Sequence, residues 1–256
     1  MSENFWYLKN CHLFERLSTD RLKQVERRAK SRTFSAKSPI YLPAEASEAV
    51  FMLASGRVKL CNFTAEGKQS ILTFIDPGEF FGELAIIESG QREEYAEAVE
   101  KSTVILIPAD EINKLIEEFP HVSMGVTKLM GLRRRRIERR LKYLLFNSNR
   151  DRLANLLLEL AEQYGKVTSD GVELSIKLSH QELANIIGST RETVTLMLGE
   201  LQNENLIRTG RRKIVLTNME KLAQSVSVAV PKLNQTLLRD ANQATKILDP
   251  AGKTIS

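Results

Sequence analysis

The chain has 256 residues, of which 42% are hydrophobic and 27% are charged. Its length predicts two modest domains of roughly 100 to 200 residues each. No run of about 18 apolar residues occurs, so we expect no membrane span and no membrane partner. Only two cysteines, Cys11 and Cys61, are present, and residues 1–10 lack the basic-then-apolar order of a secretory signal. We therefore expect a protein of the reducing cytoplasm.

The net charge of +5 and the pI near 9.2 point only weakly to nucleic acid, because many basic proteins bind none. The distribution of the charge is more informative. Residues 76–118 hold twelve acidic and three basic side chains, whereas residues 133–152 hold nine basic and two acidic ones. Opposite charges are therefore segregated along the chain.

Short β-prone runs separated by turn residues fill the segment from about Arg32 to Ile107. The runs are Val50 to Leu53, Arg57 to Phe63, Ser70 to Ile75 and Val104 to Ile107, and the turns contain Gly56, Gly67, Gly78 and Gly90. Several short strands at this spacing predict a jelly roll or a barrel. The segment before them, Leu13 to Lys30, predicts a short helix with Ser18 as its N-cap.

After Pro108 the hydrophobic period becomes helical, first over Ala109 to Glu118 and then, past Pro120, to about Asn147. In this second helix a stripe of apolar residues has coiled-coil spacing, interrupted by Arg133 and Arg134. The stripe predicts a dimer interface made of Val126, Met130, Ile137, Leu141 and Leu144. Packing of the stripe against the chain's own β domain is the alternative. The run Arg133 to Arg136 is typical of a solvated helix face that adds to a basic field.

The segment from Arg152 to Tyr164 predicts a core helix that ends at Gly165, and a short strand is expected over Leu174 to Leu178. Next, Ser179 followed three residues later by Glu182 is the capping-box pattern of a helix start.

Gly188 ends that helix, and Ser189 or Thr190 caps a second one with Val194, Leu198 and Leu201 on its apolar face. This order predicts a helix-turn-helix. Two short strands, Asn205 to Ile207 and Lys213 to Leu216, flank the residues Thr209-Gly210-Arg211-Arg212 and predict a basic β-wing.

In a helix-turn-helix the second helix presents its N-terminal side chains to the major groove of DNA. Arg191 and Glu192 lie in that turn, where arginine bridges guanine O6 and N7 and glutamate accepts from cytosine N4. Without such a context an Arg-Glu pair is usually a solvated helix face. Phosphate contacts are expected from the two helix starts and the wing, namely from Ser179, His180, Gln181, Ser189, Thr190, Arg211, Arg212 and Lys213.

From about Leu13 to Leu222 the chain resembles the catabolite activator protein and fumarate-nitrate regulator (CRP/FNR) family. The motifs that carry the resemblance are Phe81-Gly82-Glu83-Leu84, Asp151-Arg152-Leu153 and Leu183-Ala184-Asn185-Ile186-Ile187-Gly188-Ser189-Thr190-Arg191-Glu192-Thr193-Val194. The last of them is highly specific. The resemblance implies a homodimer on two-fold symmetric double-stranded DNA, with half-sites ~34 Å apart, and RNA polymerase as a further partner.

The expected fold is α+β. It comprises an N-terminal cyclic-nucleotide-binding-like β-roll (jelly roll) in residues 1–119, a long dimerisation helix in 120–148, a C-terminal winged helix-turn-helix in 149–222, and an extension of unknown role in 223–256. The resemblance also places the third base-contacting arginine of many members at Leu196, which cannot donate to guanine but can touch a thymine methyl. With Arg191, Glu192 and Thr195, Leu196 completes the expected base contacts, and an altered operator is predicted there.

The effector pocket of the family is expected around Gly82, Glu83, Leu84, Arg92, Glu93, Glu94, Ile137 and Glu138. Cyclic-AMP-responsive members hold the cyclic phosphate with an Arg-Ser or Arg-Thr pair, and the aligned positions here are Glu93 and Glu94. Carboxylates within about 4 to 6 Å of a phosphate repel it, and Arg92 is the only nearby base. Cyclic AMP is therefore not expected to be the effector.

Other cofactors of the family are constrained by their ligands. An iron-sulfur cluster needs about four cysteines, and the chain has two. Cys61, His12 or His121 could serve as axial haem ligands, but each is more often an ordinary residue. The sequence predicts no metal site, and leaves either an unidentified small-molecule effector or none.

Two rival functions fit parts of the pattern. An enzyme on a cupin-like barrel needs clustered metal ligands, yet residues 32–107 contain no histidine, so we expect no enzyme. A cyclic-nucleotide-type regulatory subunit acting on a protein partner would not need Arg191, Glu192 and a basic wing. Beyond about Gln224, the valines Val226, Val228 and Val230 allow a strand-like piece, and Leu233, Leu237 and Leu238 an amphipathic helix.

Overall fold

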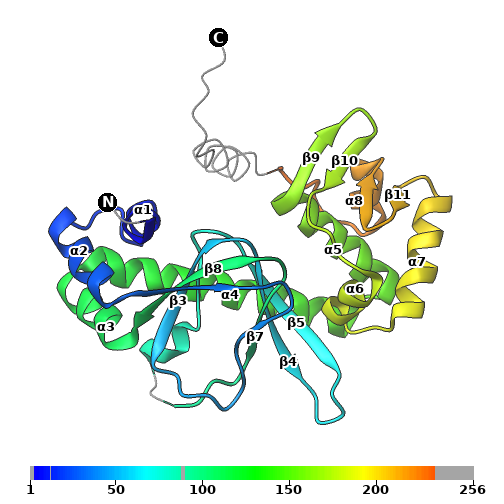
Figure 1. The fold of residues 1–256 in the computed structure, drawn as a ribbon. Helices are drawn as coiled ribbons and strands as arrows, with labels where there is room; N and C mark the ends of the chain where they lie inside the picture. The colour runs from blue at the N-terminus through cyan, green and yellow to red at the C-terminus, as the bar shows by residue number, and fades with distance from the viewer. Residues whose placement is uncertain (1–2, 12, 88–89, 234–256) are drawn as a thin grey trace. The chain divides into compact units, whose positions relative to one another are not determined.

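The computed structural model describes residues 3–11, 13–87 and 90–233 (Figure 1). The chain divides into two compact units, Met1–Leu141 and Lys142–Ser256. The fold class is α+β, as the sequence predicts, with a β-rich first unit, a long helix and a helix-turn-helix in the second unit.

Two four-stranded antiparallel sheets form the body of the first unit (Figure 1). The first sheet has the order β1 (Lys30–Phe34), β8 (Ser102–Pro108), β3 (Ala49–Ser55) and β6 (Phe80–Phe81), and the second has the order β2 (Pro39–Tyr41), β7 (Tyr95–Ala98), β4 (Val58–Phe63) and β5 (Gln69–Ile75). The four runs expected from the sequence are strands β3, β4, β5 and β8. Four further strands, β1, β2, β6 and β7, were not anticipated because they are short or polar.

The core of this unit has two layers, which strand β3 separates. Phe51 and Leu53 belong to the cluster that also contains Tyr41 and Leu60 of the second sheet, so these side chains fill the space between the sheets. The alternate residues of β3, among them Met52, belong to a second cluster with the helices. Because neighbouring strand residues point to opposite faces, β3 is buried on both sides.

Helices cover the outer face of the first sheet. They are α1 (Glu3–Lys9), α2 (Thr19–Arg28), α3 (Ala109–Glu118) and the start of α4 (Pro120–Phe146), with a 3₁₀ helix, η1 (Glu83–Ile86), after β6. The predicted Ser18 cap is confirmed, since its side chain accepts from the backbone N–H of Arg21 at 3.3 Å. Helix α3 has the predicted bounds, whereas α1 was not anticipated.

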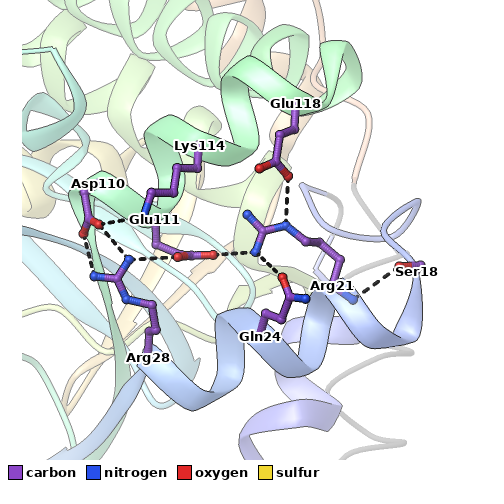
Figure 2. A network of polar contacts seen from close by, with 8 residues as sticks. All are labelled: Ser18, Arg21, Gln24, Arg28, Asp110, Glu111, Lys114 and Glu118. Atoms are coloured by element: carbon purple, nitrogen blue, oxygen red, sulfur yellow. Dashed lines mark hydrogen bonds and ion pairs between the residues drawn. The ribbon is translucent and has the colours of Figure 1, made fainter.

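A buried carboxylate joins α2 to α3 (Figure 2). Glu111 accepts from Nη1 of Arg21 at 2.7 Å and from Nη1 of Arg28 at 2.9 Å, and its side chain is only 4% exposed. Arg21 also bonds Glu118, and Arg28 bonds Asp110 with both terminal nitrogens. A buried charge is tolerated when it is paired and hydrogen-bonded, so this network fixes the two helices on the sheet.

The second unit is built around α5 (Asn149–Tyr164), whose leucines are buried. Around it lie β9 (Gly165–Thr168), β10 (Gly171–Leu174), α6 (His180–Ile187), α7 (Arg191–Asn203), β11 (Ile207–Gly210), β12 (Lys213–Leu216) and α8 (Met219–Ser225). The four strands form one antiparallel sheet in the order β11, β12, β10, β9 (Figure 1).

Two sequence-based boundaries in this unit are wrong. The strand expected over Leu174 to Leu178 ends at Leu174 and begins at Gly171, where a hairpin with β9 was not foreseen. Ile176 and Leu178 are buried without being part of a strand, and burial alone produced the apolar pattern. The first wing strand begins at Ile207 and includes Gly210, so the turn is shorter than expected.

In the extension, residues 223–225 complete helix α8, and residues 226–233 form neither helix nor strand, so the strand-like piece expected at the valines is absent. Leu237 and Leu238 lie outside the described residues. Within the described part of the chain, no helix combines the length and the apolar character that a bilayer crossing requires.

Candidate nucleic-acid interface and effector pocket

The turn between α6 and α7 is defined by three local features. The capping box at the start of α6 is complete, because Ser179 Oγ accepts from the N–H of Glu182 at 3.2 Å and Glu182 Oε2 accepts from the N–H of Ser179 at 2.8 Å. Gly188 ends α6 with a φ of +67°, a left-handed conformation that glycine adopts without strain. Thr190, rather than Ser189, caps α7 by accepting from the N–H of Thr193.

Helix α7 packs on α6 and α5 with a buried face of Val194, Met197, Leu198 and Leu201. Its remaining face is exposed and includes all four predicted base-contacting residues, Arg191, Glu192, Thr195 and Leu196. Among the described residues, neither Arg191 nor Glu192 has an ion-pair partner. Both side chains are therefore exposed to solvent and available for contact with DNA.

The expected phosphate contacts at the start of α6 are already engaged within the protein. The hydroxyl and N–H of Ser179 both donate to Glu182. His180 Nδ1 lies 2.8 Å from Thr195 Oγ1, and the amide of Gln181 donates to Asn185 at 2.8 Å. A phosphate contact at these three positions would have to compete with these bonds.

The wing is a two-residue turn between β11 and β12. Arg211 and Arg212 form the turn and are exposed, and Arg212 has a φ of +54°. Lys213 pairs with Glu173 at 2.8 Å and Arg208 pairs with Asp170 at 2.9 Å, so acidic side chains of the neighbouring hairpin hold the strands of the wing. Within the wing as the structure describes it, the cations that remain unpaired are those at the tip.

In the first unit, Arg92 lies inside the predicted effector pocket. It is buried, and a Cβ on Gly82 would lie 2.6 Å from its Nη1, which explains the glycine there. Its Cζ is 4.3 Å from the ring centroid of Tyr41 and 4.7 Å from that of Phe51, and its Nη2 donates to Ala49 O at 2.6 Å. The two ring centroids are 5.2 Å apart, so the guanidinium packs against two neighbouring aromatic rings.

Glu94 completes this cluster, because its Oε1 accepts from the Tyr41 hydroxyl at 2.5 Å. Burial raises the pKa of Glu94 above its ordinary value, although the hydrogen bond from Tyr41 opposes the shift. Burial also raises the pKa of the Tyr41 hydroxyl, to which the charge of Glu94 adds. Glu93, by contrast, is exposed.

Two basic side chains of α4 also contact the β-rich part of the first unit. Arg133 pairs with the buried Glu83 and donates to Phe80 O, and Arg140 donates to Leu72 O and, at 3.1 Å, to Ile71 O. The expectation of a solvated face is therefore wrong for Arg133 and holds for the exposed Arg134 and Arg135. Arg133 and Arg140 are seven residues apart, which places them on the same face of a helix, and this spacing was the sequence signal for their shared contact with the β-roll.

The predicted pocket residues do not all meet. Gly82, Glu83, Arg92 and Glu94 gather around Tyr41 and Phe51, which the sequence did not single out. Leu84 is 52% exposed, Ile137 is 61% exposed, and Glu138 pairs with Arg134 four residues earlier on α4.

The residues of the expected dimer stripe on α4 differ in how far they are buried within the single chain. Val126 is 7% exposed and packs within its own chain, so it offers little surface to a partner. Met130 is half-buried, whereas Ile137, Leu141 and Leu144 are exposed in the single chain.

The proposed alternatives for a metal or haem have little support in the geometry. Cys11 and Cys61 are both buried, and burial raises the pKa of the Cys11 thiol to about 11, which disfavours the thiolate that binds metal. His12 lies outside the described residues. Within the described ranges, no three His, Cys, Asp or Glu side chains gather as metal ligands would.

Comparison with known proteins agrees with both halves of the chain. Residues 31–119 match the family model of the cyclic nucleotide-binding domain, and residues 151–225 match that of the Crp-like helix-turn-helix domain. A global nitrogen regulator of Nostoc sp. is 30% identical over 186 residues, which cover 72% of this chain and 83% of that protein. The chain belongs to the CRP/FNR family of transcription regulators.

Other CRP/FNR relatives show the same extent of similarity. A cyclic AMP receptor protein of Thermus thermophilus is 29% identical over 203 residues, covering 79% of this chain and 91% of the relative. The crystal structure of a CRP/FNR regulator from the same species superposes with a TM-score of 0.61 at 30% identity, covering 77% of this chain and 98% of that one. The CRP/FNR family consists of transcription regulators with a helix-turn-helix DNA-binding domain, and these are not enzymes.

Replacing Glu94 by Gln tests the buried charge of the pocket. The pKa of Glu94 is raised in the folded state, so the folded protein binds this proton more tightly than the unfolded chain does. The contribution of Glu94 to the free energy of unfolding therefore falls as the pH rises above 4.5. Gln keeps an oxygen that accepts from Tyr41 and carries no charge. In thermal melts, the advantage of Glu94→Gln over the wild type should therefore grow as the pH rises above 4.5 and level off once Glu94 is ionised in the folded protein. The exposed Glu93→Gln is the control, and parallel melting curves for Glu94→Gln and the wild type at all pH values would contradict the interpretation.

Proposed function

We propose that this CRP/FNR protein acts as a homodimer that reads a two-fold symmetric operator through α7. The observation that carries the proposal is the capped N-terminus of α7, where Arg191 and Glu192 are exposed and unpaired among the described residues. An N-terminal turn in this position is where recognition helices contact base edges.

Two kinds of contact are proposed. Arg191 would bridge guanine O6 and N7 and Glu192 would accept from cytosine N4, so both specify sequence. Arg211 and Arg212 at the wing tip would bind phosphates and fix the position of the domain on the duplex. Ser189, Thr190 and Lys213 are proposed as further phosphate contacts, the last in competition with Glu173.

Two single substitutions separate these roles. Arg191→Ala should weaken binding to the operator by roughly 1–3 kcal/mol, with little effect on random duplex DNA. Arg211→Ala should weaken binding to both DNAs alike and lower the salt slope of log K by about 1. Fluorescence-anisotropy titrations of both DNAs at several salt concentrations measure the two effects, and equal losses on both DNAs for Arg191→Ala would contradict its role in base reading.

The homodimer is supported by the apolar positions left exposed on α4. Ile137 lies seven residues from both Met130 and Leu144, and Leu141 lies between, which is the spacing of a two-helix seam. Exposed apolar residues in such a row are covered when two copies pair along the helix.

Ile137→Asp should therefore shift the protein from dimer to monomer. The substitution places two facing carboxylates in the seam and removes two buried side chains, so we expect the dimer dissociation constant to rise by about 100-fold or more. Leu132→Asp, on the opposite side of α4 and also exposed in the chain, is the matched control. Sedimentation equilibrium measures both, and an unchanged dimer for Ile137→Asp would refute this seam.

Control by cyclic AMP is not part of the proposal. Glu94 lies where the phosphate grip would be and accepts from Tyr41, and Arg92 donates to Ala49 O and packs on two aromatic rings. An unidentified effector, or regulation without one, is compatible with this arrangement.

Adding cyclic AMP should accordingly leave the affinity for the operator unchanged at concentrations up to about 1 mM, where even a weak site would be half filled. The measurement is a DNA titration with and without the nucleotide, with a cyclic-AMP-activated relative as positive control. A tenfold gain in affinity for this protein would overturn the inference.

We further propose that the protein acts in the cytoplasm, together with RNA polymerase, and catalyses no reaction. The membership in a family of transcription regulators supports each of these points. The rival function, a regulatory subunit acting on a protein partner, gives no reason for the exposed Arg191 and Glu192 and the basic wing tip.

A further inference from the structure

The middle of α7 offers no free hydrogen-bond donor to DNA. The hydroxyl of Thr195 donates to the carbonyl of Arg191 at 2.9 Å and lies 2.8 Å from Nδ1 of His180. A hydroxyl has one proton, so both bonds form together when His180 Nδ1–H is the donor in the second. The polar group of Thr195 is then satisfied within the protein.

Leu196 is the next side chain on this surface, and it is 66% exposed. The other large apolar residues of α7 are buried against α5 and α6, so Leu196 contributes nothing to the core. An exposed leucine alone needs no explanation, but this one lies one turn after Arg191 and Glu192 on the helix proposed to enter the groove.

Gly199 adds an independent observation. It lies inside α7, three and four residues after Leu196 and Thr195, and therefore on the same face. A Cβ built on Gly199 meets no atom within 4 Å, so packing within the described protein does not require a glycine. Glycine inside a helix is less stable than alanine, hence its presence is unexplained by the free protein.

We propose that Thr195, Leu196 and Gly199 form an uncharged surface that reads the C5-methyl group of a thymine in each half-site. This inference rests on the proposed function and refines it. Hydrogen-bonded readout is confined to Arg191 and Glu192, while Leu196 contacts the methyl group that only thymine presents in the major groove. Gly199 removes the side chain that would hold the helix away from the base pairs.

The test begins with selection of a preferred operator from random duplexes by the full-length protein. Each thymine of the operator is then replaced by deoxyuridine, which removes only the C5-methyl group. For the wild type, one thymine in each half-site should show about a fourfold loss of affinity per half-site, the effect expected for one buried methyl group. For Leu196→Ala, the same replacement should have little effect.

The substitution Gly199→Ala should change stability and operator affinity in opposite directions. The melting temperature of the free protein should rise by about 2 °C or more, because alanine favours the helix. Its affinity for the operator should fall at least fivefold, while Glu200→Ala, an exposed neighbour on the same helix, serves as the control. Unchanged operator affinity of a stabilised Gly199→Ala would overturn the close approach.

The outcomes also separate this inference from the function on which it rests. A selection that enriches no sequence would contradict the proposed function. An enriched operator without a deoxyuridine-sensitive thymine, or one equally sensitive with Leu196→Ala, would overturn the methyl contact and leave operator binding intact.

Discussion

The function of the second unit depends on the short turn between α6 and α7. Gly188 ends one helix in a left-handed conformation, and two residues later Thr190 caps the next helix with its own side chain. The buried face of α7 then fixes its rotation about its axis, since Val194 and Leu198 must stay in the core. Together these constraints determine that Arg191, Glu192 and Leu196 lie on the exposed face.

The first unit uses its own charged side chains where related pockets accommodate a ligand. Arg92 packs against the rings of Tyr41 and Phe51, and Arg133 of α4 pairs with Glu83 next to Gly82. The ion pair between Arg133 and Glu83 connects the β-roll to α4. Because a buried pair is broken only at a substantial free-energy penalty, the first unit has a default state that is already cross-linked. An effector that bound beside these residues would have to compete with their contacts.

What the sequence predicts well is local. The capping box at Ser179, the left-handed Gly188 and the bounds of α3 between Pro108 and Pro120 each follow from residues within one or two turns of one another. The predictions that fail depend on distant partners. Arg133 was assigned to a solvated face because nothing nearby in the sequence reveals Glu83, fifty residues earlier.

Burial accounts for two further differences between prediction and structure, a strand that does not form and a buried contact that was not predicted. Ile176 and Leu178 are apolar because they pack in the core, and their pattern was mistaken for a strand. Glu94 and Tyr41 are more than fifty residues apart, and only the pairing of β2 with β7 brings their elements together. The exposed face of α7 was easier to predict than the pocket, because it follows from one helix, whereas the pocket draws side chains from several strands and from α4.

The proposed phosphate contacts and the proposed methyl contact affect specificity differently. Phosphate contacts release counterions and respond to salt, so the wing-tip arginines contribute affinity that does not depend on sequence. A methyl contact by Leu196 releases no counterion and adds little affinity, yet in a two-fold symmetric dimer it is made twice and its discrimination is squared. An apolar reader at this position would therefore add discrimination without adding salt-dependent affinity for random DNA. The ratio of specific to non-specific binding, rather than the affinity alone, would then decide which sites the dimer occupies.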